Sequence, residues 1–186
     1  MTVQPLAGPA LPADGDLLYE VVNGERVELP PMGIYEASIA CLLDQHLGPF
    51  AAAQQLGRVG VEYLFRLNPA ARLQRRPDLA FVSYQRWPKN RPIPRTDAWD
   101  VVPDLATEVV SKTNLAEEII LRVQEYFQAG VQLVWVIYPV VRQVYVYESP
   151  TRIRVLVSTE ELDGGTLLPG FRLPLSTLFE EGTSGG

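Results

Sequence analysis

The chain of 186 residues has one cysteine and one histidine, so the usual nucleophiles and metal ligands are scarce. Cys41 cannot form an internal disulfide, and its place in the apolar stretch IACLL predicts a buried thiol rather than a reactive one. His46 lies beside Leu43 and Leu47 in a predicted helix, which favours a packing or helix-end role over catalysis. A Ser-His-Asp triad or a zinc site therefore has little support in this sequence.

Long apolar runs and glycine-rich phosphate-binding loops are also absent from the sequence. We therefore expect no membrane-spanning helix and no nucleotide-dependent chemistry. The opening stretch MTVQPLAGPALPADGD has no basic residue and is interrupted by prolines, unlike a secretory signal or a transit peptide. These features predict a cytoplasmic protein.

Positive charge is limited overall but is concentrated in one part of the chain. The net charge of -6 argues against a protein whose whole surface binds nucleic acid. Basic residues that gather on both sides of Asp78 could contact phosphates, or could simply keep loops soluble. These residues are Arg66, Arg72, Arg75, Arg76, Arg86, Lys89, Arg91 and Arg95.

Length and composition predict one globular domain. Hydrophobic residues make up 47% and charged residues 20% of the chain, an ordinary composition for a soluble domain. A chain of this length can bury one core but is short for two. We expect an N-terminal extension over residues 1–17, a single domain over residues 18–180 and a frayed tail over residues 181–186.

Turn residues and periodicity predict the secondary structure. Asn23-Gly24, which accepts the positive φ angles of a tight turn, predicts a β-hairpin from residues 18–22 and 26–29. Helical spacing of apolar residues predicts a helix over residues 34–47. Strands are predicted over residues 59–67, 79–82, 105–111, 131–138, 141–147 and 152–157, and a mobile loop over residues 84–100.

A second helix is predicted from Thr113 or Asn114, either of which can cap it, to Gln128, with Gly130 ending it. Its expected inward stripe consists of Leu115, Ile119, Ile120, Val123 and Phe127. The strand-helix-strand unit over residues 105–138 should pair its strands in parallel. The element order therefore predicts an α/β or α+β fold with a mixed sheet and helices packed on it.

Two acidic residues are placed where strands are expected. Asp78 directly precedes the apolar run LAFV, and Glu108 lies inside the apolar strand LATEVV. A carboxylate in an apolar strand must be paired, neutralised or bound to a cation. Adjacent strands are about 4.8 Å apart, so the two carboxylates could meet in an oxygen-rich site suited to Mg²⁺ or Mn²⁺. Spacing alone leaves open that arginines or backbone donors satisfy them instead.

The order of several short motifs is similar to that of a known family. The segments YEVVNGERVEL, RRPDLAFVS, VPDLATEVVSKTN and YFQAGVQLVWVIYP, followed by GFRLPLSTLF, resemble the Uma-type family of endonucleases. This family is a branch of the PD-(D/E)XK restriction-endonuclease-like superfamily. The similarity extends from Tyr19 to the closing segment, and the order and spacing of the motifs make it specific.

The resemblance implies a restriction-endonuclease-like core, with a mixed central β-sheet flanked by helices and an N-terminal β-hairpin. It also implies an endonuclease that uses Mg²⁺ or Mn²⁺ to hydrolyse nucleic acid, expected to be DNA. Asp78 takes the Asp position of the PD motif, and Glu108 takes the acidic position of the (D/E)XK motif. Both are then expected to be catalytic residues and metal ligands.

The lysine of the motif is replaced in this sequence. Val110 stands in its place, a departure that the family shares, and family members commonly carry a lysine where this chain has Arg122. Arginine keeps the charge but cannot act as a titrating base. Lys112 is the second candidate, because side-chain alternation places it on the face of Glu108, about 6.6 Å beyond Val110.

Other residues receive roles on weaker grounds. Glu36 stands near the start of the first helix, where the family often has a histidine, and is either an accessory metal ligand or a first-turn acid that complements the helix dipole. The candidate nucleic-acid contacts are Arg76, Arg91, Arg95 and Gln124. Tyr126 could also contact nucleic acid, although half-buried packing is the expected role.

Two other functions are compatible with the sequence. A catalytically inactive nuclease fold could act as a nucleic-acid-binding or regulatory subunit, which Arg122 in place of lysine and the acidic net charge favour. A structural homo-oligomer without a site is the third reading. The apolar strands near the C-terminus could support a homodimer.

Overall fold

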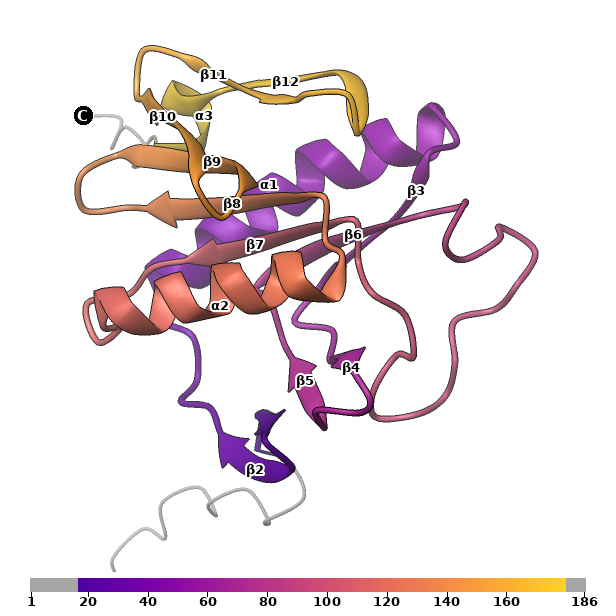
Figure 1. Cartoon of the computed structure of the whole chain (residues 1–186). Helices are drawn as coiled ribbons and strands as arrows, with labels where there is room; N and C mark the ends of the chain where they lie inside the picture. The colour runs from indigo at the N-terminus through magenta and orange to yellow at the C-terminus, as the bar shows by residue number, and fades with distance from the viewer. Residues whose placement is uncertain (1–16, 180–186) are drawn as a thin grey trace, which may run out of the picture.

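The computed structural model describes residues 17–179 and shows a mixed β-sheet between helices (Figure 1). It confirms the expected fold class and the N-terminal hairpin. The elements are β1 (Tyr19–Val22), β2 (Glu25–Glu28), α1 (Ile34–Ala53), β3 (Gly57–Val61), β4 (Phe65–Asn68), β5 (Leu73–Arg75), β6 (Leu79–Ser83), β7 (Leu105–Val109), α2 (Ala116–Ala129), β8 (Leu133–Tyr138), β9 (Gln143–Ser149), β10 (Arg152–Val157), β11 (Glu161–Gly164), β12 (Leu168–Pro174) and α3 (Leu175–Phe179).

The central sheet has six strands in the order β10-β9-β8-β7-β6-β3. β7 and β8 are parallel and are joined through α2, as the crossover rule predicts, whereas the other neighbouring pairs are antiparallel. β8 lies inside the sheet, and all its residues except Tyr138 are buried, as expected for a strand covered on both faces.

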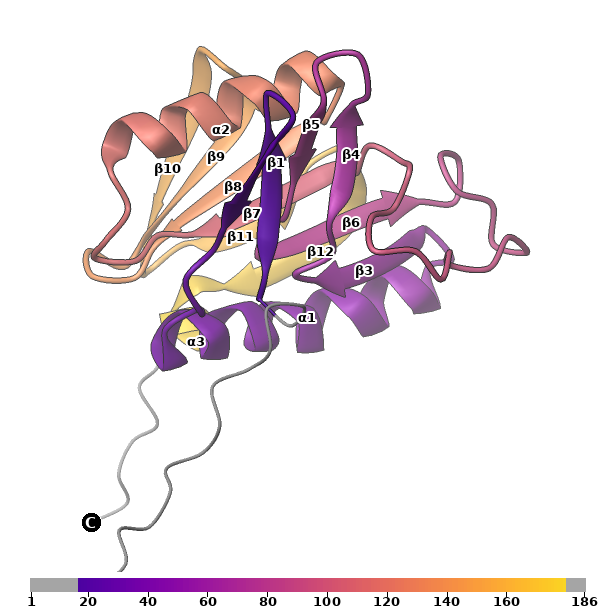
Figure 2. The same ribbon diagram turned by 90° about the horizontal axis from the view of Figure 1, so that it is seen from below.

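Alternate residues of the central strands supply two separate cores. Leu79, Leu105 and Trp135 belong to one core with α1, β12 and α3. Ala80, Ala106 and their neighbours belong to the other core, beneath α2. Figure 2 shows the sheet between α1 on one side and α2 on the other. This two-sided burial fixes the direction in which each strand residue points.

A second sheet, in the order β2-β1-β5-β4, stands on the α2 side of the molecule. Asn23 and Gly24 have φ angles of 54° and 86°, so the hairpin turn forms as expected. The prediction of one strand over residues 59–67 is wrong, because this part of the chain forms two strands. β3 joins the central sheet, and β4 joins the second sheet. The chain turns between them at Glu62, whose φ is 53°.

Helix α1 begins at Ile34 as predicted but continues past Leu47 to Ala53. The predicted inward stripe consists of Ile34, Ile39, Leu42, Leu43 and Leu47. Of these, Ile39, Leu43 and Leu47 are buried and Ala51 extends the stripe by one turn, whereas Leu42 is half-buried and Ile34 is 92% exposed. Cys41, by contrast, is exposed, so its predicted burial is wrong.

His46 is also exposed on α1, which removes the predicted packing role. Both errors, at Cys41 and His46, have one cause. Apolar neighbours along the sequence of a helix do not share its inward face unless they are three or four residues apart.

Helix α2 presents a different face from the one predicted. Ile119 and Val123 are buried, but Leu115 and Ile120 are 64% and 51% exposed, and Tyr126 is fully buried. The helix packs between β8 and β4. The residues that face inward are four and three positions apart, at 119, 123 and 126.

The ends of α2 also differ in part from expectation. The N-cap is Leu115 rather than Thr113 or Asn114. The Asn114 carboxamide oxygen instead accepts a hydrogen bond from Ser111 in the preceding turn. Gly130 ends the helix in the left-handed region as predicted, with a φ of 98°.

The segment over residues 84–100 is a loop, as predicted, but it is anchored rather than free. Trp87 and Trp99 are buried and pack edge to face at 5.3 Å. The Arg58 guanidinium donates hydrogen bonds to the backbone carbonyls of Trp87, Lys89 and Arg91. These contacts hold the loop against the body of the protein.

None of the helices described within residues 17–179 is long and apolar enough to cross a membrane. The predicted tail over residues 181–186 and all but the last residue of the predicted extension over residues 1–17 lie outside the described residues.

Candidate active site

The fold brings Asp78 and Glu108 together at one end of the central sheet. Leu79 of β6 pairs with Thr107 of β7 in an antiparallel register, so the residues on either side, Asp78 and Glu108, lie opposite each other. The backbone N–H of Val109 donates a hydrogen bond of 2.6 Å to Asp78 Oδ2. Asp78 is therefore fixed to the end of the strand that carries Glu108.

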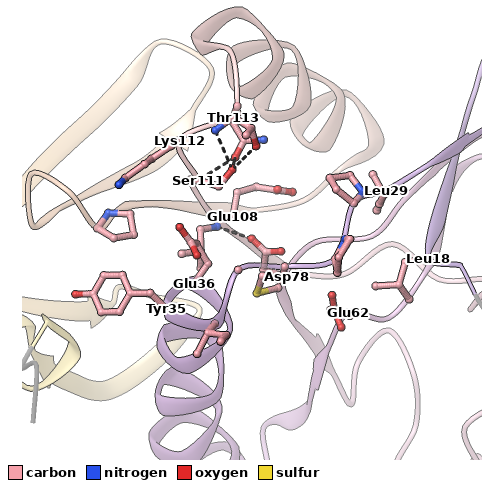
Figure 3. A pocket seen from close by; sticks show the side chains of 18 of the residues that line it. Leu18, Leu29, Tyr35, Glu36, Glu62, Asp78, Glu108, Ser111, Lys112 and Thr113 are labelled. Atoms are coloured by element: carbon pink, nitrogen blue, oxygen red, sulfur yellow. Dashed lines mark hydrogen bonds between the residues drawn. The ribbon is translucent and has the colours of Figure 1, made fainter. Parts of the chain in front are cut away.

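Both carboxylates border a cavity of about 640 Å³. Figure 3 shows Asp78, Glu108 and Glu36 in the middle of this cavity, with Tyr35 on one side and Leu18 and Leu29 on the other. The walls come from the linker between β2 and α1, the loop before α2 and the turn after β8, over residues 29–36, 111–114 and 139–140. The two acids that are distant in sequence thus share one cavity that is open to solvent.

Glu108 is held from the side of α2. Glu108 is only 7% exposed. Its Oε1 accepts a hydrogen bond of 2.5 Å from the hydroxyl of Tyr126. The Arg122 guanidinium lies 3.7 Å from the same oxygen. Both contacts use Oε1. The other carboxylate oxygen of Glu108, Oε2, accepts no hydrogen bond from the described residues.

A buried carboxylate that the sequence analysis missed organises the arginines behind the site. Glu20, in β1, is 1% exposed and pairs with Arg75 at 2.7 Å and with Arg122 at 2.6 Å. It also accepts a hydrogen bond of 2.9 Å from the backbone N–H of Arg76. Arg75 in turn pairs with Glu125 of α2 at 2.6 Å. Glu20 therefore links the hairpin to the helix that supports Glu108.

A sequence signal for Glu20 existed. It is an acid inside the apolar strand LYEVV, as Glu108 is inside LATEVV. Its partner could not be read, because Arg122 is 102 residues further along the chain.

Burial changes the protonation of the acids in the cavity. Burial, together with the negative charge of Glu108, raises the pKa of Asp78 to about 8, although the Val109 N–H acts in the opposite direction. Burial also raises the pKa of Glu108, against the opposing effects of Arg122 and the Tyr126 hydroxyl. Two carboxyl groups with raised pKa values in one cavity form a site that a cation would stabilise.

Arg122 and Lys112, the two candidates for the missing lysine, occupy different environments. Arg122 is mostly buried, and although burial lowers its pKa, Glu108 and Glu20 outweigh that effect and raise it, so the group stays charged. β7 ends at Val109, so the prediction that strand alternation places Lys112 beside Glu108 is wrong. Lys112 lies in the following turn, and its side chain in Figure 3 extends away from Asp78. It still borders the cavity.

Glu36 borders the cavity from the first turn of α1, where it can also complement the helix dipole. Within the described part of the chain, no three acidic, histidine or cysteine side chains converge into a ready-made metal site. In this structure Glu36 therefore does not complete a set of three ligands with Asp78 and Glu108.

The candidate nucleic-acid contacts are spread over the molecule. Arg76 borders the cavity, but its guanidinium donates hydrogen bonds to the backbone carbonyls of Tyr19 and Glu62. Arg91, Arg95 and Gln124 are exposed and do not line the cavity. The loop with Arg91 and Arg95 follows the end of β6 opposite to Asp78 (Figure 1). Arg91 stacks on Trp87, with its guanidinium 3.6 Å from the ring centroid.

Helices on both faces of a mixed sheet, with Asp78 and Glu108 opposite each other on adjacent strands, are the arrangement expected for a restriction-endonuclease-like fold. The sequence matches the Uma2 family, described as "Putative restriction endonuclease", over residues 9–176. The chain belongs to the Uma2 family.

A solved structure has the same fold. It is a "putative nuclease belonging to DUF820" from Anabaena variabilis ATCC 29413, with a TM-score of 0.75 and 18% sequence identity. The similarity covers 87% of this chain and 89% of that chain. No curated protein matches the sequence. Family and fold together place the chain among nuclease-like proteins.

The residues at the site fit a divalent metal ion of the kind that such nucleases generally use. Asp78 Oδ1 and Glu108 Oε2 accept no hydrogen bond from residues 17–179, whereas the second oxygen of each carboxylate is already held. Oxygen donors of this kind suit Mg²⁺ and Mn²⁺, and two protein carboxylates are a common number for Mg²⁺ sites completed by water.

Proposed function

We propose that the protein is a Mg²⁺- or Mn²⁺-dependent endonuclease that hydrolyses phosphodiester bonds in nucleic acid, with DNA as the expected substrate. The observation that carries this proposal is the pair Asp78 and Glu108, opposite each other on adjacent strands within one cavity. A buried pair of carboxylates is costly unless a proton or a cation neutralises the repulsion between them, and a divalent cation can replace the proton. Membership of the Uma2 family supports the same function.

Each residue of the site has a distinct role in this proposal. Asp78 and Glu108 would hold the metal ion through the oxygens that accept no hydrogen bond from residues 17–179. The Val109 N–H fixes Asp78, and the Tyr126 hydroxyl fixes Glu108, so both carboxylates are positioned before metal or substrate binds. Pre-positioned ligands lose little freedom on binding, which favours both affinity and correct geometry.

A bound divalent cation would polarise the scissile phosphate and lower the pKa of the attacking water. Arg122 stays charged across the working pH range and would neutralise charge that develops on the phosphate. Lys112, at the wall of the cavity, would contact a phosphate of the substrate. Glu36 would act through water rather than as a direct ligand.

A nuclease assay tests this proposal directly. Plasmid and single-stranded substrates are incubated with the protein across a range of Mg²⁺ and Mn²⁺ concentrations, beside the variant Asp78→Ala. We expect metal-dependent cleavage that Asp78→Ala reduces by at least about 100-fold, because a ligand of the metal is lost. Equal cleavage by both proteins, or cleavage without divalent metal, would contradict the assignment.

A catalytically inactive binding or regulatory subunit is the second candidate. The position of Arg122 favours it, because the guanidinium lies closer to Glu20, at 2.6 Å, than to Glu108, at 3.7 Å. In that case the protein would bind nucleic acid without cleaving it under any metal condition. The substitution Arg122→Lys, which restores the lysine common in the family, would then leave cleavage absent. A homodimer and a cytoplasmic location stay predictions.

A further inference from the structure

Two of the walls of the cavity are apolar, in contrast to its acidic floor and to the polar wall over residues 111–114. The linker before α1 contributes Leu29, Pro30, Pro31 and Met32, and the turn after β8 contributes Pro139 and Val140. Neither wall contains a charged residue. The composition of these walls determines which part of a nucleic acid can lie against them.

Cationic side chains around the cavity are few and mostly engaged. Arg122 is paired with Glu20, and Arg76 donates to backbone carbonyls. Lys112 is the one basic residue among the described lining residues that has no ion pair or hydrogen bond through its side chain. Acids, by contrast, line the cavity at Glu36, Glu62, Asp78 and Glu108. Apart from a bound metal, the site therefore offers a phosphate backbone little electrostatic attraction.

Apolar side chains project into solvent at the mouth of the cavity. Ile34 is 92% exposed and Val140 is 77% exposed, and each lines the cavity on a different wall. Tyr35, with 37% of its surface exposed, lies next to Ile34. Figure 3 shows Tyr35 on the side of Lys112, across the cavity from Leu18 and Leu29. Apolar surface around a charged floor suits a ligand with both a flat apolar part and an anionic part.

We infer that the cavity takes unpaired nucleotides, at a single strand, a frayed end or an extruded base, rather than the backbone of an intact duplex. An intact duplex presents phosphates along both strands, which need more Lys or Arg contacts than Lys112, the one unengaged basic residue of the described lining, can supply. An unpaired base presents a flat face that packs on aromatic and apolar side chains without regard to sequence. Its phosphate would then lie beside Lys112 and a metal ion held by Asp78 and Glu108. This inference rests on the proposed function and specifies its substrate class.

A binding experiment tests the substrate class separately from hydrolysis. Labelled oligonucleotides of about 16 nucleotides are prepared as a single strand, a blunt duplex and a duplex with a single-stranded end. Fluorescence anisotropy measures their binding in Ca²⁺, so that binding is observed without dependence on turnover. The wild-type chain is compared with the double variant Ile34→Ser/Val140→Ser. Ile153→Ser is the matched control, because Ile153 is an exposed apolar residue on β10, outside the cavity lining.

We expect the single strand and the tailed duplex to bind at least about tenfold more tightly than the blunt duplex. The double variant should lose about tenfold in affinity for the single strand, and Ile153→Ser should lose none. The slope of log affinity against log salt should be shallower than about -2, since few phosphates are contacted. Equal or tighter binding of the blunt duplex, an unchanged affinity of the double variant, or no binding of any oligonucleotide would overturn the inference.

Cleavage assays on the same oligonucleotides distinguish this inference from the proposed function. Preferential cleavage of the blunt duplex in Mg²⁺ or Mn²⁺ would support the endonuclease and overturn the preference for unpaired nucleotides. A single-strand preference in binding, with no cleavage in either metal, would support the substrate class and remove the hydrolytic function.

Discussion

At the scale of single residues, the two oxygens of Glu108 have different surroundings. The Tyr126 hydroxyl and Arg122 approach Oε1, and no described residue donates to Oε2. A hydrogen bond to the charged form of a carboxyl group lowers its pKa, so Tyr126 keeps Glu108 more readily ionised than burial alone would allow. In the proposed metal site, Tyr126 would therefore be a positioning residue that acts through Glu108.

The substitution Tyr126→Phe tests this role. It removes one hydroxyl without changing the apolar volume, so the protein should fold with a loss of about 2 kcal/mol of stability. Affinity for Mn²⁺ should fall by about 10- to 100-fold, as for other residues that orient a metal ligand. Calorimetric titration measures the affinity, and Tyr145→Phe, outside the cavity lining, is the control. Unchanged metal affinity in Tyr126→Phe would show that Tyr126 only packs.

The raised pKa of Asp78 predicts how metal affinity depends on pH. With a pKa of about 8 the carboxyl carries a proton at neutral pH, and a metal ion must displace that proton. Affinity for Mg²⁺ should therefore increase by about tenfold per pH unit below pH 8 and level off above it. Titrations between pH 6 and pH 9 measure the dependence. A flat profile below pH 8 would show that Asp78 is already ionised without metal.

The same pKa predicts the opposite trend for the stability of the metal-free protein. An Asp carboxyl in the unfolded chain titrates near pH 3.9, whereas Asp78 in the folded protein titrates near 8. Between these values the folded protein binds a proton that the unfolded chain has lost, so the free energy of unfolding decreases as the pH rises through this window. Urea unfolding in a chelator measures this decrease, and Asp78→Asn should abolish much of it.

Sequence reasoning could identify Asp78 and Glu108 because an acid beside or inside an apolar strand is chemically unusual. Glu20 is also an acid inside an apolar strand, but it does not belong to a recognised sequence motif and sequence reasoning does not select it. Half-buried packing is the role that the sequence predicts for Tyr126, whereas the side chain is fully buried and its hydroxyl donates a hydrogen bond to Glu108. Contacts between β1 and α2 depend on how a second sheet docks, which no local pattern in the sequence encodes.

At the scale of secondary-structure elements, the N-terminal hairpin is attached to the body through backbone hydrogen bonds and through its buried charge. β1 meets β5 at one register pair, Val21 with Gln74. Glu20 adds ion pairs to Arg75 and Arg122 and a hydrogen bond to the Arg76 N–H. A buried ion pair contributes little by itself, but removing one partner leaves the other charges uncompensated. The hairpin and α2 should therefore lose stability together.

The substitution Glu20→Gln tests this coupling. It keeps the shape of the side chain but removes the charge that faces two arginines, so we expect a loss of about 3 kcal/mol in the free energy of unfolding. Urea unfolding measures the loss, and Glu28→Gln is the control, because Glu28 is exposed on β2 of the same hairpin. A similar, small effect of both substitutions would mean that the ion pairs are dispensable.

The elements themselves were predicted with uneven success, for physical reasons. The hairpin turn, the parallel β7-β8 pair and the end of α2 at Gly130 follow from local backbone preferences or from the handedness of crossovers. The separation of β3 from β4 does not, because one continuous β-rich segment can serve two sheets when a residue such as Glu62 adopts a positive φ. The inward face of α2 likewise depends on tertiary packing, because the helix lies between β8 and β4.

At the scale of the whole molecule, the candidate site and the arginine-rich loop are at different ends of the central sheet. Asp78 precedes β6 and the loop with Arg91 and Arg95 follows it, so the strand, about 17 Å long, lies between Asp78 and the start of the loop. A short ligand in the cavity cannot reach both places. A long one can, and the predicted contact of this loop with nucleic acid then depends on substrate length.

The double variant Arg91→Ala/Arg95→Ala tests this dependence. Binding of an oligonucleotide of about 16 nucleotides should weaken and its salt dependence should flatten, whereas binding of one of about 4 nucleotides should not change. Fluorescence anisotropy over about 50 to 200 mM salt provides the comparison. Unchanged binding of the longer oligonucleotide would remove the loop from the binding surface, and loss of the shorter one would place the loop at the cavity.

Calorimetric titration of Mn²⁺ into the wild-type chain and into Glu108→Ala, at a pH above 8, tests the account most directly. Above this pH both proteins have an ionised Asp78, so only the second carboxylate differs. The account predicts saturable binding of Mn²⁺ to the wild type and a loss of at least about 100-fold in Glu108→Ala. Equal binding by the two proteins, or no binding by the wild type, would contradict a metal site shared by Asp78 and Glu108.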